Sequence, residues 1–236
     1  MPLKPSFSLI ENHSGDYDAR TALIGRIIAT YSGLIRPYAV VRFKIIHLRF
    51  LEEMAQYLPD DGDILDLGCG FGLYALFMAA CKPSAQIIGL DLNVRRLEIA
   101  QASARKLGLR NVRFERQDLR DWTPDREMTG AYALDVFHHI PVTSGDALLR
   151  SLFAHLKPGG GFLLKDIDTR PRSMLWFTYL LDLLMSPRDR FFYRSGAAWR
   201  EQLTEIGFEP VYLHYLWDIL PYPHVLFICS KPDRAR

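Results

Sequence analysis

The sequence predicts an α/β fold in which helices cover both faces of one mostly parallel β-sheet. The middle of the chain, residues 63–168, alternates short apolar runs with helical stretches, which is the rhythm of βαβ units. A glycine-rich turn, Asp66 to Gly72, follows the first of these runs and opens a helix. The length of 236 residues, with 49% hydrophobic and 24% charged residues, fits one globular domain and excludes a disordered chain.

The apolar runs and the segments between them define the elements of this sheet. Bounded by Gly, Pro or Asp, five runs predict buried parallel strands at residues 64–67, 86–92, 112–117, 131–137 and 161–167. Helical periodicity predicts helices at residues 73–81, 94–107 and 145–156. Further on, Ser195 is the expected N-cap and Gly207 the expected C-cap of another helix. Residues 209–216 and 224–229 are expected to close the sheet as a hairpin.

Residues 19–51 are apolar and basic, with six cations and no carboxylate. Pro37 is expected to end or kink a first helix near Arg36, and a second helix is expected from residue 38 to 56. Arg42 and Arg49 would then share one face of the second helix, because they are seven residues apart. The cations interrupt every apolar window that is long enough to span a bilayer, so this segment predicts amphipathic helices.

A second apolar segment, residues 174–185 (MLWFTYLLDLLM), has arginines on both sides and is too short to span a membrane. We therefore expect an N-terminal amphipathic helical segment at residues 1–57 and a main domain at residues 58–236. The main domain carries a helical insertion at residues 170–194, and the insertion and the N-terminal helices are expected to form a lid.

Composition excludes several classes of protein. A net charge of +2 argues against nucleic acid as the main partner. Three scattered cysteines, Cys69, Cys81 and Cys229, predict neither a disulfide framework nor a metal site, and they fit a reducing compartment. The first 15 residues lack the pattern of a secretory signal, so we expect a cytoplasmic protein.

Carboxylates at three strand ends indicate a bound adenosine with a zwitterionic tail. The glycine turn lacks the spacing of a dinucleotide fingerprint and of a phosphate loop, and Asp66 before it suits an ammonium group better than a phosphate. Asp91 ends the second strand, where a carboxylate accepts hydrogen bonds from ribose hydroxyls. Asp118 follows the third strand, where a carboxylate can accept a hydrogen from an adenine amine.

Together these motifs resemble the class I S-adenosylmethionine-dependent methyltransferases over residues 64–168. ILDLGCGFG is similar to the family's first motif, GLDLN to its ribose-binding strand end and QDL to its adenine-side motif. YALDVFHHI and LKPGGGFLLKDID resemble its fourth-strand and fifth-strand segments. The resemblance implies S-adenosyl-L-methionine as cofactor, S-adenosyl-L-homocysteine as product, and a Rossmann-like seven-stranded sheet in the order 3-2-1-4-5-7-6 with an antiparallel last strand. It also implies the cofactor-binding residues Asp66, Gly68, Cys69, Gly70, Gly72, Asp91, Leu92, Asp118, Leu119 and Asp135.

Two of these residues have alternative roles. Cys69 is expected to touch the cofactor through its backbone, because no basic residue stands beside it to activate a nucleophilic thiol. Asp135 either holds the end of the fourth strand near the methyl donor or caps a turn, and the sequence favours neither role.

The catalytic candidates are His139, which we prefer, then His138 and Asp166. Methyl transfer needs in-line approach of the acceptor, and it needs a base only if the acceptor arrives protonated. An imidazole titrates in the right range to be that base. In the equally weighted alternative, one histidine packs under the cofactor and neither moves a proton.

The two apolar-basic segments suggest a hydrophobic acceptor, either lipid-like or aromatic. They also suit docking on the cytoplasmic face of an anionic membrane, although a closed lid or a homodimer seam would explain the same residues. A fainter resemblance of residues 179–195 and 162–168 is to methyltransferases of bacterial aryl-polyene and related lipid-like pigment pathways. The rival hypotheses are an aminopropyl transferase on the same fold and a non-catalytic, cofactor-binding partner subunit.

Overall fold

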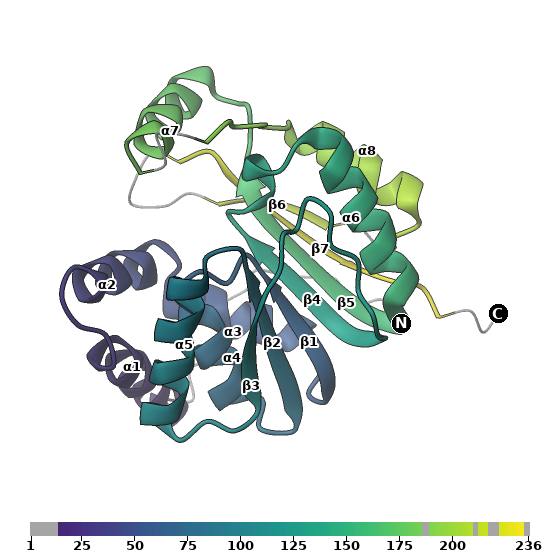
Figure 1. Cartoon of the computed structure of the whole chain (residues 1–236). Coiled ribbons are helices and arrows are strands. Elements are labelled where there is room, and N and C mark those ends of the chain that lie inside the picture. The colour runs from purple at the N-terminus through teal and green to yellow at the C-terminus, as the bar shows by residue number, and fades with distance from the viewer. Residues whose placement is uncertain (1–13, 186–188, 210–211, 217–221, 234–236) are drawn as a thin grey trace.

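One seven-stranded sheet in the order β3-β2-β1-β4-β5-β7-β6 forms the centre of the protein (Figure 1). The computed structural model describes residues 14–185, 189–209, 212–216 and 222–233. Strands β1 to β5 pair in parallel, and β7 runs antiparallel to β5 and to β6, so the predicted order and the predicted hairpin are confirmed. The strands are β1 (Gly62–Leu67), β2 (Ala85–Asp91), β3 (Val112–Arg116), β4 (Met128–Leu134), β5 (Leu156–Ile167), β6 (Tyr212–Leu216) and β7 (His224–Ser230).

Helices cover both faces of the sheet because the buried strands are apolar on both sides. In β4, Tyr132 and Leu134 belong to one hydrophobic core, whereas Ala131 and Ala133 belong to the other. The first core also contains side chains of α1 to α5, and the second contains side chains of α6 and α8. Helices α1 to α5 lie on one side of the sheet and α6 and α8 on the other (Figure 1). The helices are α1 (Ser14–Ala29), α2 (Ile35–Ile45), α3 (Leu48–Tyr57), α4 (Leu73–Cys81), α5 (Val94–Leu107), the 3₁₀ turn η1 (Phe137–His139), α6 (Val142–His155), α7 (Arg172–Met185) and α8 (Gly196–Ile206).

The N-terminal segment contains three helices, so the prediction of two helices divided at Pro37 is wrong. Pro37 lies in the first turn of α2, where the backbone N–H groups have no partner within the helix and a proline is tolerated. A second break comes at His47, whose ring accepts a hydrogen bond from the Phe50 N–H and caps α3. Arg42 and Arg49 therefore lie on different helices and do not share a face.

Strand β4 ends earlier than the sequence predicts. The predicted strand reached residue 137, but β4 stops at Leu134 because Asp135 turns the chain with a φ of 58°. Residues 137–139 then form η1, which carries both candidate histidines. Part of the predicted strand at residues 209–216 lies outside the described residues, and β6 begins at Tyr212.

The apolar insertion forms a helix, α7, as predicted. It lies beyond the end of β5, on the side of the sheet toward which the strands β1 to β5 point (Figure 1). After it, Ser195 caps α8 through a 3.2 Å hydrogen bond from the Ala198 N–H, and Gly207 ends α8 with a φ of 111°, which confirms both predicted caps. In the part of the chain that the structure describes, no helix has the length and apolarity needed to cross a membrane.

Candidate active site

The carboxyl ends of β1, β2, β4 and β5 meet at one edge of the sheet and bring the predicted site residues together. This edge is where open α/β sheets bind ligands. The glycine turn after β1 packs directly against the segment after β4, because a Cβ atom at Gly68 would collide with the Val136 side chain. The glycine turn therefore lies beside the two histidines of η1, although about 70 residues separate them in sequence.

The glycine turn needs glycines for two different reasons. At Gly72 a Cβ atom would lie 2.7 Å from the Ala100 side chain and 2.8 Å from the Phe114 ring, so the turn can pack there only without a side chain. At Gly70 the backbone φ is 56°, and no other described atom lies within 4 Å of the position that a Cβ would occupy. Gly70 therefore presents bare backbone to an open space, as a ligand-binding turn requires.

Asp91 connects the end of β2 to the glycine turn. Its two carboxylate oxygens accept hydrogen bonds from the Gly70 N–H, at 2.9 Å, and from the Asn93 N–H, at 2.8 Å. Each carboxylate oxygen has a further lone pair, so Asp91 can still accept two hydroxyl hydrogens. This geometry fits the predicted contact with a ribose.

Asp66 is buried beneath the same turn. Burial raises the pKa of its carboxyl group to about 7, with a further contribution from the negative charge of Asp91. Its Oδ2 atom is inaccessible to solvent and has no hydrogen-bond partner among the described residues. The Tyr132 hydroxyl acts on the same carboxyl group and opposes the rise of its pKa. The predicted contact between Asp66 and an ammonium group stays a prediction, because this oxygen lies beneath the turn and not on its surface.

Asp118 and its neighbours lie farther out. The Asp118 carboxylate makes a bidentate pair with Arg120, with distances of 2.8 Å and 2.5 Å, so an adenine amine would have to share it with Arg120. Leu92 is half exposed at the end of β2, where an adenine ring could lie against it. Leu119 is buried in the core on the α6 side and anchors this turn.

Cys69 is buried in the glycine turn. Burial, helped by the charges of Asp66 and Asp91, raises the pKa of its thiol well above the ordinary value. A neutral thiol is a poor nucleophile, so the environment agrees with a contact through the backbone rather than with covalent chemistry.

Asp135 is the centre of a buried ion-pair network that the sequence did not reveal. Its carboxylate lies 2.6 Å from Lys165 Nζ on β5, 3.0 Å from Arg42 Nη2 on α2 and 3.6 Å from His224 Nε2 on β7. Although burial opposes its ionisation, these three groups lower the pKa of Asp135 below the ordinary range. Asp135 therefore joins an N-terminal helix to the sheet, a contact that the sequence did not suggest.

His138 and Asp166 form a buried pair. The Nδ1 atom of His138 lies 2.5 Å from Asp166 Oδ1, which also accepts a hydrogen bond from the Ile167 N–H. A carboxylate only accepts hydrogen bonds, so the Nδ1 atom carries a hydrogen and the Nε2 atom is left to accept a proton. Burial alone would lower the pKa of His138, but the carboxylates of Asp166 and Asp182 outweigh it and raise the pKa.

His139 has a different environment. Its ring lies 4.2 Å from that of His138 between centroids, and its side chain is 31% exposed, against 3% for His138. Burial and the neighbouring His138 lower the pKa of His139 to about 4. Its nearest carboxylate is Asp189, at 3.4 Å. His139 is therefore the more accessible but the weaker base.

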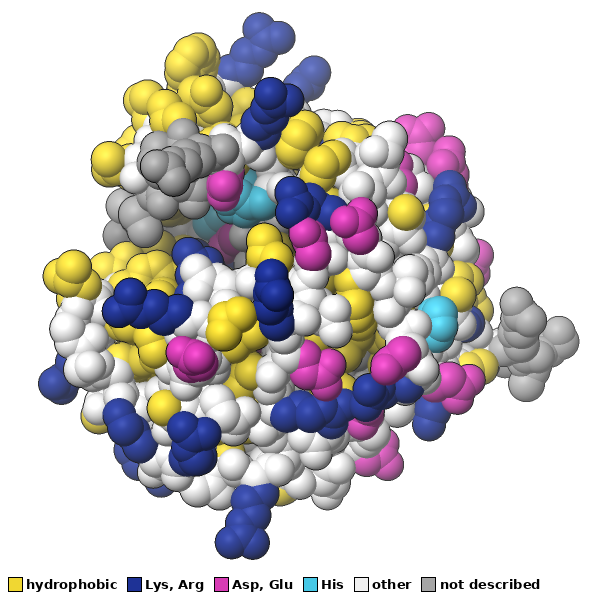
Figure 2. Space-filling view, viewed as in Figure 1, with side chains coloured by type: hydrophobic (Ala, Val, Ile, Leu, Met, Phe, Trp, Pro, Cys, Tyr) yellow, Lys and Arg dark blue, Asp and Glu magenta, His cyan; other side chains and the backbone are white. Residues whose placement is uncertain are grey.

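On the side of α7, the site also contains residues that the sequence did not point to. Asp182 on α7 faces His138, and Tyr193 stacks on the His138 ring and donates a 2.7 Å hydrogen bond to Asp182. Phe191 packs against His139 and Tyr193. No spacing pattern could identify these residues, because the conformation of residues 189–195 decides which rings meet the histidines. Figure 2 shows a hollow between α7 and α2 with histidine and acidic side chains visible inside it.

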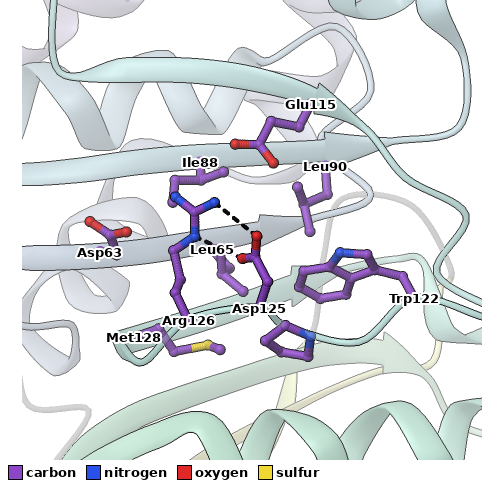
Figure 3. Close-up of a pocket in the computed structure, with 10 residues that line it drawn as sticks. Asp63, Leu65, Ile88, Leu90, Glu115, Trp122, Asp125, Arg126 and Met128 are labelled. Carbon is purple, nitrogen blue, oxygen red and sulfur yellow. Dashed lines mark hydrogen bonds and ion pairs between the residues drawn. The ribbon is translucent and has the colours of Figure 1, made fainter.

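A separate pocket lies away from this edge. It has a volume of about 10 Å³ and lies between β1, β2 and the loop that leads to β4 (Figure 3). Leu65, Ile88 and Trp122 line it, and Arg126 pairs with Asp125 beside it. Such a volume holds a water molecule at most, so this pocket is not a ligand site.

Comparison with known proteins gives one family. The family described as "Methyltransferase domain" matches residues 40–213. A trans-aconitate 2-methyltransferase of Methylobacterium radiotolerans is 35% identical over 126 residues, which cover 52% of this chain and 46% of that protein. The S-adenosyl-L-methionine-dependent Diels-Alderase iccD of Talaromyces variabilis is 32% identical over 133 residues, which cover 53% of this chain and 44% of that protein. The matched region thus spans less than half the length of these two relatives.

A solved structure, the DhpI-SAM-HEP complex, has a similar fold. It superimposes with a TM-score of 0.58 at 20% identity, covering 94% of this chain and 100% of that one. The likeness extends the agreement in fold to nearly the whole chain, including parts outside the motifs.

Proposed function

Because the chain belongs to the methyltransferase domain family, we propose that it transfers the methyl group of S-adenosyl-L-methionine to a hydrophobic small-molecule acceptor, lipid-like or aromatic. The observation that carries this proposal is the 2.9 Å contact between Asp91 and the Gly70 N–H. It fixes a carboxylate with spare acceptor capacity beside the open position at Gly70.

The residues of the glycine turn fit this cofactor. Asp91 would receive the ribose hydroxyls. The carboxyl group of Asp66, which is buried beneath the turn, would when ionised attract the ammonium group of the methionine part through its charge. When bound, the cofactor supplies a methyl group on a sulfonium, so that the acceptor atom bonds to the methyl carbon while the sulfur keeps the electron pair of the broken bond. Gly70 allows the backbone to approach it closely.

His138 is the best-placed proton acceptor if the acceptor arrives protonated. Asp166 holds the ring through Nδ1, which orients the Nε2 atom toward α7 and stabilises an imidazolium. His139, which the sequence favoured, has no comparable partner and a pKa of about 4. In this proposal His139 is a wall of the acceptor site, together with Phe191.

The surroundings of the histidines favour a hydrophobic acceptor. Phe191 and Tyr193 pack against the histidines, and Tyr179 of α7 packs against Phe191. The nearby carboxylates of Asp166, Asp182 and Asp189 would repel an acidic acceptor, while Arg42 and Lys165 are already paired with Asp135. An aromatic or lipid-like molecule without negative charge fits this environment best.

Exposed apolar side chains support docking on an anionic membrane surface. On α7, Trp176 is 65% and Leu184 is 75% exposed, and Figure 2 shows hydrophobic and cationic side chains together over this helix. On the other side of the hollow, α2 exposes Val41 beside the cations Arg36 and Lys44. A surface of this composition suits the interface between lipid headgroups and acyl chains, where a lipid-like acceptor would be found.

Methyl-labelled cofactor tests the proposal directly. The purified protein is incubated with labelled S-adenosyl-L-methionine and with lipid and pigment extracts, and an organic-soluble product heavier by one methyl group is expected. Asp91→Ala is the matched control, and it should label far less at the same cofactor concentration. Cofactor binding without transfer would favour a non-catalytic subunit, and transfer of an aminopropyl group from the decarboxylated cofactor would favour the aminopropyl alternative.

A further inference from the structure

Asp182 is the carboxylate of α7, a helix that is otherwise apolar from Met174 to Met185 apart from Thr178. It points inward: Thr178, one turn before it, is fully buried, whereas Leu180 and Leu184 lie on the exposed side. Turning a carboxylate toward the protein interior costs free energy unless it has partners there. The partners of Asp182 therefore indicate what it does.

The partners of Asp182 are His138, the candidate base, and Tyr193, which stacks on its ring. The Oδ2 atom of Asp182 accepts a 2.7 Å hydrogen bond from the Tyr193 hydroxyl and lies 3.8 Å from the Nε2 atom of His138. Asp166 occupies the other ring nitrogen, so His138 stands between two carboxylates that come from β5 and from α7. The Phe192 N–H donates a 2.7 Å hydrogen bond to the His138 carbonyl and fixes the segment that carries Tyr193.

His138 and Asp166 are almost completely shielded from solvent, with exposed fractions of 3% and 1%, whereas Asp182 is 20% exposed. A proton accepted at Nε2 therefore has a partly exposed carboxylate, that of Asp182, 3.8 Å away. Burial raises the pKa of Asp182, although His138 and Tyr193 oppose this, so the carboxyl group can hold a proton transiently.

We propose that Asp182 is a positioning residue of the base: it sets the proton affinity of His138 Nε2 and provides the exit by which a proton taken from the acceptor reaches solvent. This role rests on the proposed function and specifies it, because it requires an acceptor with a dissociable hydrogen, such as a hydroxyl group. The proton moves from the hydroxyl oxygen to Nε2, and the electron pair of the O–H bond stays on that oxygen. Because Asp182 is carried by α7, the base is complete only when this helix lies over the site.

The test follows the His138 ring by NMR in the full chain, as a function of pH and without an acceptor. Asp182→Asn should lower the His138 pKa by about 1 unit, because a carboxylate that stabilises the imidazolium has been removed without a change of shape. Tyr193→Phe should lower it less, because the loss of the hydroxyl favours protonation of Asp182. Asp189→Asn is the matched control: it removes a carboxylate near His139 and should leave the His138 pKa unchanged.

An unchanged His138 pKa in Asp182→Asn would overturn the proposal, and so would an equal shift in Asp189→Asn. If Asp182→Asn does not fold, Tyr193→Phe decides alone: a lowered His138 pKa supports the coupling and an unchanged one overturns it. Failure of methyl transfer in the labelling experiment would not affect this titration. The two proposals can therefore fail separately.

Discussion

His138 and His139 are adjacent in sequence, yet the structure gives them opposite properties. The ring of His138 is held between carboxylates, which raise its pKa, while the ring of His139 is flanked by His138 and Phe191 and its pKa falls to about 4. Neighbouring residues of a 3₁₀ turn point in different directions, so one histidine meets Asp166 and the other faces Asp189.

The two histidines predict different pH profiles of activity. An imidazolium cannot accept a proton, so if His138 is the base the rate should rise with pH through its raised pKa, above about pH 6.5. If His139 is the base, the rate should already be constant above about pH 6, because its pKa is about 4. The rate of methyl transfer at saturating cofactor, measured from pH 5 to pH 9, distinguishes them. In the first case His138→Ala should lower the rate by about two orders of magnitude, and His139→Ala much less.

Asp91 predicts a specific loss of cofactor affinity. Asp91→Ala should weaken the binding of S-adenosyl-L-homocysteine by about 1–3 kcal/mol, because hydrogen bonds to a charged acceptor are lost. Isothermal titration calorimetry measures this. Asp125→Ala is the control, because Asp125 pairs with Arg126 outside the site. Equal affinities of Asp91→Ala and the unmodified protein would show that the ribose lies elsewhere.

At the scale of elements, Asp135 ties α2 to β4, β5 and β7 through one carboxylate. The helix that covers the site on the N-terminal side is therefore held by a buried ion pair as well as by apolar packing. If the carboxylate of Asp135 is removed, Arg42 and Lys165 lose this counter-ion and stay desolvated. The loss of a buried counter-ion destabilises the folded state.

Asp135→Asn should accordingly lower the free energy of unfolding by about 3 kcal/mol at pH 7. Asparagine tolerates a positive φ, so the substitution removes the charge and keeps the backbone. The folded-state pKa of Asp135 is depressed, so its contribution to stability is present above the unfolded pKa and is lost as the pH falls below about 4. Urea unfolding should therefore show a large difference between variant and unmodified protein at pH 7 and a smaller one at pH 3. An equal difference at both pH values would contradict the charge argument.

The exposed side of α7 predicts an effect on membrane binding that salt does not remove. Leu180→Ser with Leu184→Ser should reduce binding to lipid vesicles at both low and high salt, because buried apolar area contributes about 25 cal/mol per Å² and is not screened. Co-sedimentation with vesicles measures it. The double variant should keep its affinity for S-adenosyl-L-homocysteine, since neither residue contacts the glycine turn. Unchanged sedimentation would leave α7 as a lid only.

At the scale of the whole molecule, the two apolar-basic segments lie on either side of one hollow although about 130 residues separate them in sequence (Figures 1 and 2). If both segments bind the membrane, the hollow between them faces the lipid. This arrangement also explains why Arg42, which looked like a membrane contact in the sequence, is not one: its guanidinium points inward to Asp135.

On α2, Arg36 and Lys44 are therefore the cations expected to bind an anionic membrane. Arg36→Glu with Lys44→Glu should weaken co-sedimentation with anionic vesicles at low salt, and the difference should shrink at high salt as the Debye length falls. Arg105→Glu with Arg110→Glu makes the same change in charge in the last turn of α5 and in the loop that follows it, away from the hollow, and should have little effect. If the unmodified protein stays in the supernatant and its mass rises with concentration, the surface is instead a seam between two copies of the chain.

The sequence by itself predicted the strands of the sheet and the glycine turn at its edge. The glycine turn and the position of Asp91 follow from local patterns, because a strand that ends in a glycine turn and opens a helix is specified by residues adjacent in the chain. The order of the strands was implied by the family resemblance, and the structure confirms it. The tertiary structure alone decided the partners of Asp135 and His138. Lys165, Arg42 and Asp182 come from distant segments, and which of them meets which carboxylate or imidazole depends on how α2 and α7 pack over the sheet. Periodicity and spacing describe one segment at a time, so they cannot predict contacts that form only when separate elements are brought together.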